Sequence, residues 1–595
     1  PNDFEVGKRH NLEVISVIDD KGFMNENAGK YKGMTREQAR KAIVADLDAL
    51  GLIEKIEPYT HNVGVCYRCH TVVEPKVSEQ WYLKMDELAK PAIEVVKDGE
   101  TKFIPQRFEK IYFNWMENIK DWCISRQLWW GHRIPCWYCD DCGEMIVSKT
   151  DPDVCPKCGS KRLRQEEDVL DTWFSSALWP FSTLGYPDKT EDLEYFYPTS
   201  LLVTAYDIIF FWVARMIFSG IEHMGKTPFP EVLIHGIVRD AQGRKMSKSL
   251  GNGIDPLLLI DKYGADSLRY SLCTGVAPGG DIRFSDDRME SSRNFMNKLW
   301  NASRYVVMNL ENVKTKNVDE VTLTGADKWI LTKLQNVIVD VRKNLDKYEI
   351  GLALSKLYDF VWSDYCDWYI ELTKPMLYSM DEDKKTGALS VLKYVLTEIL
   401  KLMHPFTPFI TEEIWTYLNV SETIMLESYP VYNEKYDFVK EYENFEKVKD
   451  VIGKIRNIRA EMNVPVSKKV HLYVLTREQE TFEKASVYIE KLAGISGIEF
   501  IEKKEEAGDK VCGAATLGAE LFIPLGELVD AEKETARLTK EKEKVLAEIK
   551  RSEGMLNNPG FVSKAPARLI DAEKQKLEQN RALLAKIEKQ ISDLK

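Results

Sequence analysis

The sequence predicts a multidomain protein in which a parallel α/β sheet is followed by an α-helical bundle and an antiparallel coiled coil. Three observations predict this organisation. The 595 residues exceed what one hydrophobic core can organise. Apolar strands alternate with a helical segment between residues 168 and 285, whereas residues 286–465 show helical spacing throughout. The last seventy residues carry two seams of apolar side chains at heptad spacing.

Residues 1–65 are predicted to form an α+β region. The alternating residues 12–18 are typical of a short strand, and the pattern of residues 36–50 indicates a charged amphipathic helix. The chain begins at Pro1 without a methionine, so we expect it to be a fragment of a longer protein.

Residues 66–167 are predicted to contain a zinc ribbon. Two Cys-x2-Cys pairs lie twelve residues apart, and each pair can direct two thiolates at one ion. Four thiolates complete a tetrahedral site that leaves no position open for catalytic water, so a structural Zn2+ is expected and a zinc hydrolase is not. The predicted ligands are Cys139, Cys142, Cys155 and Cys158, with Cys136 as a bystander.

A third pair, Cys66-x2-Cys69, lies next to His70. No second pair follows it at zinc-ribbon spacing. A metal site completed by other ligands and a simple thiol pair both remain open for these two residues.

Residues 168–285 are predicted to form a Rossmann-like sheet. Apolar strands at residues 201–203 and 232–234 flank a helix that spans residues 208–217. The run Lys245-Met246-Ser247-Lys248-Ser249 follows the later strand, at the sheet edge where such folds bind ligands. Its ammonium groups and backbone N–H groups suit a polyphosphate.

The remaining regions are predicted from periodicity. Residues 286–465 are predicted to form successive helices, and the aromatic residues there, including Trp362, Trp368 and Trp415, are interpreted as core packing.

Residues 466–525 return to short strands and are predicted to form a small α/β connector. In residues 526–595 two seams surround the helix-breaking Pro559 and Pro566, which predicts an antiparallel hairpin. The seams are Leu538, Val545, Ile549 and Leu556, and Leu577, Leu584, Ile587, Ile591 and Leu594.

Charge and hydropathy limit the location and the partners of the chain. The net charge is −12, so nucleic-acid contacts must come from local patches. No stretch approaches the roughly 20 apolar residues of a membrane span, and residues 1–15 do not resemble a signal peptide. A cytoplasmic protein is expected. The hairpin arm has 15 Lys and Arg against 13 Asp and Glu, which fits either a solvated structural arm or an arm that binds RNA.

The motifs resemble those of class I aminoacyl-tRNA synthetases, and most closely the valyl-tRNA synthetase family. Residues 245–249 match the KMSKS signature, and residues 168–176 and 204–216 resemble the family's substrate-pocket motifs. The terminal hairpin is also typical of that family, whereas the related isoleucyl enzymes, the runner-up, usually lack it. The resemblance implies six parts. Residues 1–65 are the end of the editing domain, residues 66–167 are the connective region with the zinc ribbon, and residues 168–285 are the second half of the catalytic domain. Residues 286–465 are the anticodon-binding domain, residues 466–525 are a connector, and residues 526–595 are the tRNA-binding arm.

The resemblance also implies the chemistry. The carboxylate of valine attacks the α-phosphate of ATP with Mg2+ present, and the valyl group then passes to tRNA(Val). Lys245 and Lys248 are expected to act as the catalytic residues by stabilising charge on the phosphates. Asp207 is expected to bind the ATP ribose, with Ala205 where the family motif has glycine. The remaining expected ATP-binding residues are Met246, Ser247, Ser249, His235 and Gly236.

A valine pocket and an editing residue follow from the same resemblance. Trp173, Ile208 and Trp212 are expected to wall the pocket, with the last two one helical turn apart on one face. Threonine has nearly the shape of valine, so editing by hydrolysis is expected as well. Asp3 matches the aspartate that holds the ammonium group of mischarged threonine.

One motif of the class is not present in this sequence. No His-x-Gly-His occurs, and we therefore expect the chain alone not to activate valine. A tRNA-binding module without catalysis is the alternative of another class. We expect the protein to act as a monomer.

Overall fold

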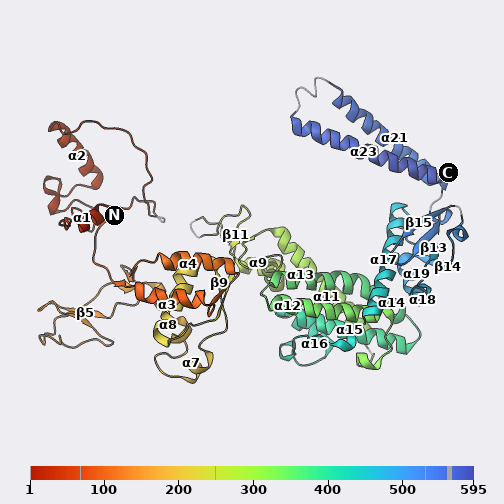
Figure 1. Cartoon of the computed structure of the whole chain (residues 1–595), viewed down its shortest axis with the longest axis horizontal. Helices are drawn as coiled ribbons and strands as arrows, with labels where there is room; N and C mark the ends of the chain where they lie inside the picture. Colours follow the sequence, from red (N-terminus) through yellow and green to blue (C-terminus); the bar gives the residue numbers. More distant parts are fainter. Residues whose placement is uncertain are drawn as a thin grey trace. The chain divides into compact units, whose positions relative to one another are not determined.

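The computed structural model describes residues 2–66, 69–247, 250–311, 313–508, 510–528, 531–558 and 566–594 (Figure 1). These form two compact units. The first contains residues 1–253 with Pro278–Asp281, and the second contains Ile254–Ala277 with Ile282–Lys595. Every helix in the described ranges is too short or too polar to cross a membrane.

A parallel three-stranded sheet organises the first unit, in the order β2-β10-β9. Val232 in the central strand is fully buried and pairs with Phe103 on one side and Leu202 on the other. Buried side chains from the helices α3, α4 and α8 join those of the strands in one core, as predicted for a parallel sheet with covered faces. The elements are β2 (Lys102–Ile104), β9 (Leu202–Ala205), β10 (Glu231–His235), α3 (Asp86–Lys97), α4 (Glu109–Glu117) and α8 (Arg215–Met224).

The sheet extends beyond the predicted range of residues 168–285. Strand β2 and helices α3 and α4 lie within residues 66–167, which the sequence assigned to the connective region. Phe103 anchors strand β2 to the sheet, because its buried side chain packs in the same core as Val232. A three-residue strand is too short to show an alternating pattern, so the sequence alone did not reveal it.

The predicted strand at residues 12–18 is wrong. Only Ile18 forms a bridge there, to Met24, and Leu12 is 62% exposed. Alternating apolar residues form a strand only where a neighbouring strand satisfies their backbone groups. The helix predicted beside it is confirmed as α2 (Arg36–Ala49), which begins at a capping box between Thr35 and Gln38. A further short helix, α1 (Asn2–Arg9), begins the described chain.

Short antiparallel strands frame the cysteine region. The ribbon has the order β6-β5-β7, with Trp137 opposite both Ile146 and Gln165. A second pair joins Ser125 to Leu170 and so brings the two ends of the ribbon segment together. The elements are β5 (Cys136–Cys139), β6 (Met145–Val147), β7 (Leu163–Gln165), β4 (Ser125–Arg126) and β8 (Val169–Leu170).

The second unit begins with two helices, α9 (Pro256–Tyr263) and α10 (Ala265–Cys273), which lie within residues 168–285 that the sequence assigned to the sheet, and it continues into the predicted helical bundle. Trp415 is buried, and Trp362 and Trp368 pack partly buried against the same core, which confirms the interpretation of these aromatic residues. Side chains at three- and four-residue spacing, such as Ile330, Leu334, Ile338 and Val341, are fully buried. The main helices are α9 (Pro256–Tyr263), α10 (Ala265–Cys273), α11 (Asp286–Leu310), α12 (Gly325–Leu345), α13 (Ile350–Asp359), α14 (Ile370–Leu377), α15 (Glu382–Met403), α16 (Pro408–Leu418) and α17 (Val439–Glu461).

The small connector is a four-stranded sheet with two helices. Its strand order is β14-β13-β16-β15, with β13 and β14 parallel and the other pairs antiparallel. The alternating burial of β13 matches a strand with one covered face. The elements are β13 (Val470–Leu475), β14 (Ile495–Ile501), β15 (Val511–Ala515), β16 (Glu520–Pro524), α18 (Gln479–Lys484) and α19 (Ser486–Ala493).

The terminal arm consists of α21 (Ala531–Leu556) and α23 (Ala567–Leu594), which lie side by side (Figure 1). The predicted seams meet in one apolar cluster, in which Ile587 and Leu538 are almost fully buried. Ion pairs from Lys542 to Glu588 and from Glu548 to Lys576 show that the helices run antiparallel, as predicted. The side chain of Leu594 and residues 559–565 lie outside the described parts.

Candidate functional site

The sheet brings two predicted ATP-binding segments to the same edge. His235 ends β10 and pairs with Ala205, the last residue of β9. The segments that follow the two strands therefore begin side by side. Asp207 follows β9 in the short helix η3 (Tyr206–Ile208), and the KMSKS loop follows β10. The Nζ of Lys245 lies 2.7 Å from Oδ2 of Asp207. Two residues assigned to ATP from different motifs therefore meet.

A carboxylate and an amide hold the KMSKS loop in shape. Asn252 accepts a hydrogen bond from the backbone N–H of Ser247 at 2.9 Å and donates one to Oδ2 of Asp240 at 3.0 Å. Asp240 also accepts from the side chain of Arg244 at 2.7 Å. The hydrogen bond from Asn252, aided by Arg244, lowers the pKa of Asp240 to about 2. Lys248 and Ser249 lie outside the described residues.

Gly236 is required by a close approach of two segments. A Cβ at this position would lie 2.0 Å from the carbonyl oxygen of Gly280. The contact places Asp281 where it accepts hydrogen bonds from the backbone N–H of Ile237, at 2.9 Å, and from the side chain of Arg239. Only glycine permits this packing at the start of the loop. The His235 side chain is exposed, and its Nδ1 lies 2.8 Å from the oxygen of Gly236.

Two of the three predicted pocket residues belong to one apolar cluster. Trp173 and Trp212 are both partly buried and pack against the core that includes the side chains of the sheet. The indole of Trp212 donates to the carbonyl of Ser176 at 3.3 Å, so it is tied to the helix that carries Trp173. That helix is α5 (Thr172–Ser176).

Contrary to expectation, Ile208 and Trp212 do not share one α-helical face, because the local structure differs. Ile208 ends η3, and Trp212 lies in the π-helical turn η4 (Ile209–Ala214) that precedes α8. The φ of Ile208 is −118°, so the two residues are not on one continuous α-helix. A π-helical turn is often found at functional sites, and three aromatic residues, Phe210 to Trp212, lie in it.

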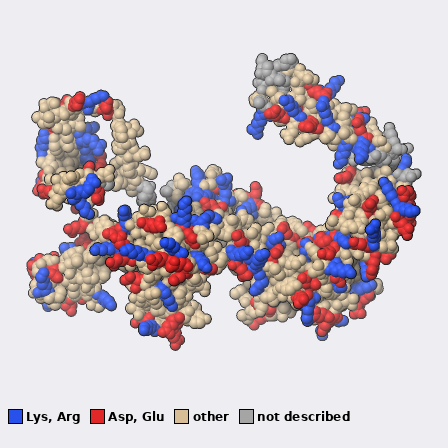
Figure 2. All heavy atoms as spheres, in the orientation of Figure 1, with Lys and Arg blue, Asp and Glu red and all other residues tan. Residues whose placement is uncertain are grey.

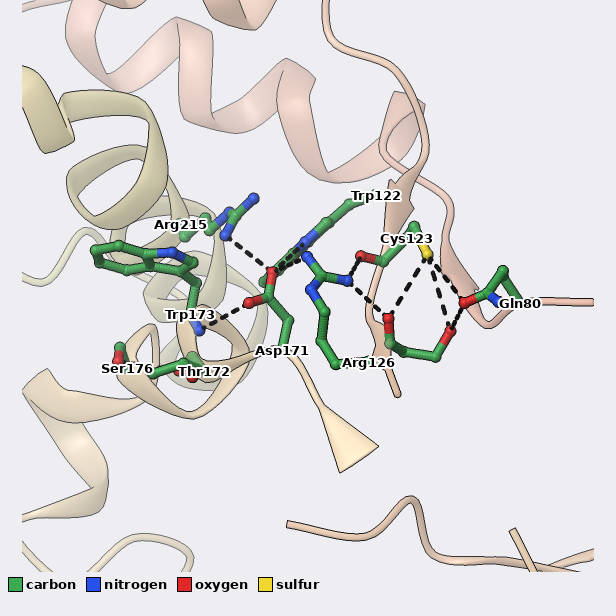
Figure 3. Close-up of polar contacts among 10 residues, drawn as sticks. Gln80, Trp122, Cys123, Arg126, Asp171, Thr172, Trp173, Ser176 and Arg215 are labelled. Atoms are coloured by element: carbon green, nitrogen blue, oxygen red, sulfur yellow. Dashed lines mark hydrogen bonds and ion pairs between the residues drawn. The ribbon is translucent and has the colours of Figure 1, made fainter. Parts of the chain in front are cut away.

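Asp171, which no motif pattern singles out, lies beside the candidate pocket residue Trp173 at the centre of a polar network (Figure 3). Its carboxylate is buried, and its Oδ2 accepts hydrogen bonds from the indole of Trp122 at 3.0 Å and from Arg126 at 2.7 Å. The guanidinium of Arg215 approaches the same oxygen at 3.5 Å. The other oxygen caps the helix that carries Trp173.

Arg215 is an unusually buried cation. Its guanidinium stacks over the indole of Trp122 at 3.7 Å, and only 6% of the residue is exposed. Burial lowers the pKa of Arg215 to about 10, and the charge of Asp171 partly opposes that shift. Arg215 therefore stays protonated at neutral pH and depends on Asp171 for its counter-charge.

The four predicted zinc ligands are brought together. The sulfur atoms of Cys139, Cys142, Cys155 and Cys158 all lie within 4.8 Å of one another. Cys139 and Cys158 are 3.5 Å apart, and Cys142 and Cys155 are 3.7 Å apart. A tetrahedral Zn2+ with bonds of about 2.3 Å places its sulfur ligands about 3.8 Å apart, so the cluster fits the ion. Cys136 is buried outside this cluster.

Comparisons with known proteins agree across the chain. Residues 3–285 match the model for class I tRNA synthetases (I, L, M and V), residues 327–474 the anticodon-binding domain of tRNA ligase, and residues 530–595 the valyl tRNA synthetase tRNA binding arm. The valine–tRNA ligase of Clostridium perfringens is 56% identical over 600 residues, which cover 100% of this chain and 68% of that protein. The chain belongs to the valine–tRNA ligase family. The ligases of Clostridium acetobutylicum and Bacillus subtilis are 55% and 49% identical, again over 100% of this chain and 68% of their own length.

In this valine–tRNA ligase family member, the predicted editing residue and the third cysteine pair lie far from the KMSKS loop in the sequence. Asp3 lies in the first turn of α1 and is exposed. Cys69 contacts the hydroxyl of Thr71 at 3.3 Å. Among the described residues, the cysteine cluster of the ribbon is the metal-ligand group that the structure contains, and Cys66 and Cys69 are not part of it.

The arm of this valine–tRNA ligase family member carries charges of both signs. Figure 2 shows lysine and arginine interspersed with aspartate and glutamate along it. Some of these charges pair across the two helices, as Lys576 does with Glu548 at 2.7 Å and Arg581 with Glu553 at 2.7 Å. Such exposed pairs contribute little to stability.

Proposed function

We propose that the chain acts in valine–tRNA ligation. The carboxylate of valine attacks the α-phosphate of ATP, which forms valyl-adenylate and releases pyrophosphate. The 3′-terminal hydroxyl of tRNA(Val) then takes the valyl group and AMP leaves. The observation that carries the proposal is the contact of Lys245 with Asp207 at the carboxyl edge of the sheet, in a chain that matches valine–tRNA ligases along its whole length.

The side chains at the sheet edge have separate roles in this reaction. Lys245 and Lys248 stabilise the charge that develops on the phosphates, and Asp207 binds the ribose of ATP. The proposal also assigns ATP binding to Met246, Ser247, Ser249, His235 and Gly236. Mg2+ bound with ATP neutralises phosphate charge.

Trp173 and Trp212, with Ile208, form the valine pocket of this proposal. Two indoles that are fixed by the same core exclude larger side chains by volume. They do not reject threonine well, since valyl enzymes as a class discriminate against it by only about a hundredfold at the synthetic site. Hydrolysis of threonyl-tRNA(Val) provides the remaining accuracy, and Asp3 binds the ammonium group of the mischarged residue.

The other parts serve the proposed function as supports and as tRNA contacts. Zn2+ held by Cys139, Cys142, Cys155 and Cys158 stabilises the ribbon, whose buried cluster includes the side chains of Cys139 and Cys155. The helical bundle of residues 286–465 binds the anticodon side of tRNA(Val). The arm of residues 526–595 binds the tRNA body, and the protein works as a monomer.

Valine-dependent exchange of pyrophosphate into ATP tests the proposal. The assay uses this chain and an extended protein, in which the upstream residues of the Clostridium perfringens ligase precede it. Exchange that prefers valine and falls about a hundredfold in Lys245→Ala supports the proposal. The control is Lys262→Ala, since Lys262 is an equally exposed lysine that pairs with Asp286 at 3.5 Å. A preference for isoleucine, or tRNA binding with no exchange in the extended protein, would overturn it.

A further inference from the structure

Asp171 joins the candidate valine pocket to the buried centre of the first unit. We propose that Asp171 is a positioning residue for valine selection, which acts by fixing the helix that carries Trp173. The inference rests on the proposed function, because that function assigns Trp173 to the pocket.

The two oxygens of Asp171 have different partners. Oδ1 accepts a hydrogen bond from the backbone N–H of Trp173 at 3.4 Å, which caps the first turn of α5. Oδ2 faces the indole of Trp122 and the guanidinium groups of Arg126 and Arg215 (Figure 3). One carboxylate thus connects α5 to strand β3 (Trp122–Cys123), to β4 and to α8.

Helix α5 needs such an anchor because it has only five residues. A helix this short is unstable by itself, and its position must come from the contacts at its ends. Asp171 holds the first end. The indole of Trp212 holds the last, through the carbonyl of Ser176 at 3.3 Å. The two candidate pocket walls are therefore linked through α5.

The partners of Oδ2 are themselves held in place. Arg126 also donates to the carbonyls of Cys123 and Ser125, at 2.9 and 2.8 Å. Arg215 is buried and stacked on Trp122. Because these donors are fixed, the position of the carboxylate is fixed too, and with it the backbone of Trp173.

Replacement of Asp171 by asparagine separates the two roles. Asparagine keeps Oδ1 and the cap, but it presents an NH2 group to three donors and leaves Arg215 without a counter-charge. We expect α5 to move away from these donors and the Trp173 wall to shift. The KM for valine should rise about tenfold and the KM for ATP should change less than twofold. The ratio of isoleucine to valine activation should rise.

The test uses two variants and a matched control in the extended protein. Asp171→Asn is the main variant. Arg126→Gln is the second, because Arg126 is partly exposed and its loss removes one donor without leaving a buried charge. Asp327→Asn is the control, since Asp327 is also buried near a helix start, where it accepts from Thr324 and Tyr369. The control should lower the unfolding temperature and leave the KM for valine unchanged.

Hydrogen exchange of the α5 amides provides a readout that is independent of activity. In Asp171→Asn the amides of residues 172–176 should exchange about tenfold faster, while those of α8 keep their protection. Unchanged α5 amides, or equal rises in the KM for valine and for ATP, would overturn the positioning role. If Asp171→Asn does not fold, Arg126→Gln decides by the same two readouts. A wild-type protein with no valine-dependent exchange would contradict the proposed function, and the amide measurement would still test the role of Asp171.

Discussion

The ammonium group of Lys245 lies 2.7 Å from the carboxylate of Asp207, although 38 residues separate them in the chain. Both side chains are at least 31% exposed, so the pair is open to a ligand. In the proposed site the lysine belongs to the phosphates of ATP and the aspartate to its ribose. ATP must therefore replace this ion pair when it binds.

The first prediction concerns Lys245. Its replacement by alanine removes phosphate stabilisation and also frees Asp207 from a competing partner. We expect the rate of adenylate formation to fall about a hundredfold while the KM for ATP does not rise. Steady-state pyrophosphate exchange at varied ATP measures both. If the KM for ATP rises as the rate falls, Lys245 contributes chiefly to binding ATP in the ground state and not to stabilising the transition state.

The second prediction concerns pH and Asp240. Its pKa in the folded protein is about 2, below the value of about 3.9 in an unfolded chain. A depressed pKa stabilises the fold fully above the unfolded value, and this stabilisation is lost as the pH falls through the folded value. The difference in unfolding temperature between wild type and Asp240→Asn should be constant from pH 5 to 7 and shrink below pH 4. A difference that grows on acidification would contradict the assignment.

The third prediction concerns the ribbon. One Zn2+ per chain should be found by elemental analysis, and Cys155→Ala should lose it together with the order of the ribbon. Cys136→Ala is the matched control, because Cys136 is buried in the same strand as Cys139 but outside the cluster. Loss of the metal from the control, or its retention in Cys155→Ala, would show a different ligand set.

The fourth prediction concerns the arm. Ile587 is almost fully buried between the two helices, whereas Leu583, one turn earlier, is 41% exposed. Ile587→Ala should destabilise the arm by roughly 2–4 kcal/mol and Leu583→Ala by much less. Hydrogen exchange of the arm's backbone amides at increasing urea concentrations measures this difference in the free energy of unfolding. Binding of tRNA(Val) should weaken in Ile587→Ala alone, and equal weakening in both variants would contradict a role for the folded hairpin.

The sequence predicted the features that depend on local periodicity. The two apolar seams of the arm, the buried tryptophans of the bundle and the four-cysteine cluster follow from spacing alone. The structure confirms that these side chains come together. The predicted strand at residues 12–18 failed because a strand depends on a partner that spacing does not reveal. Strand β2 was missed for a similar reason, since three residues show no period.

The polar networks of the site could be predicted less well. Asp171, Asp240 and Asn252 lie inside or beside the recognised motifs. However, Trp122 and Arg126 are 49 and 45 residues from Asp171, and Asn252 is 12 residues from Asp240. The spacing of a motif does not indicate which of its carboxylates will be buried against an arginine. The signal for Asp171 was its place one residue before α5, as a residue type that caps helices.

In the proposed site the KMSKS loop and the pocket of Trp173 and Trp212 bind one molecule of valyl-adenylate. Calorimetric titration of the extended protein with non-hydrolysable valyl and isoleucyl analogues of the adenylate tests this. We expect the valyl analogue to bind at least tenfold more tightly, and Asp207→Ala and Trp212→Ala each to weaken its binding. Equal affinity for the two analogues, or binding that neither variant changes, would rule out a shared site.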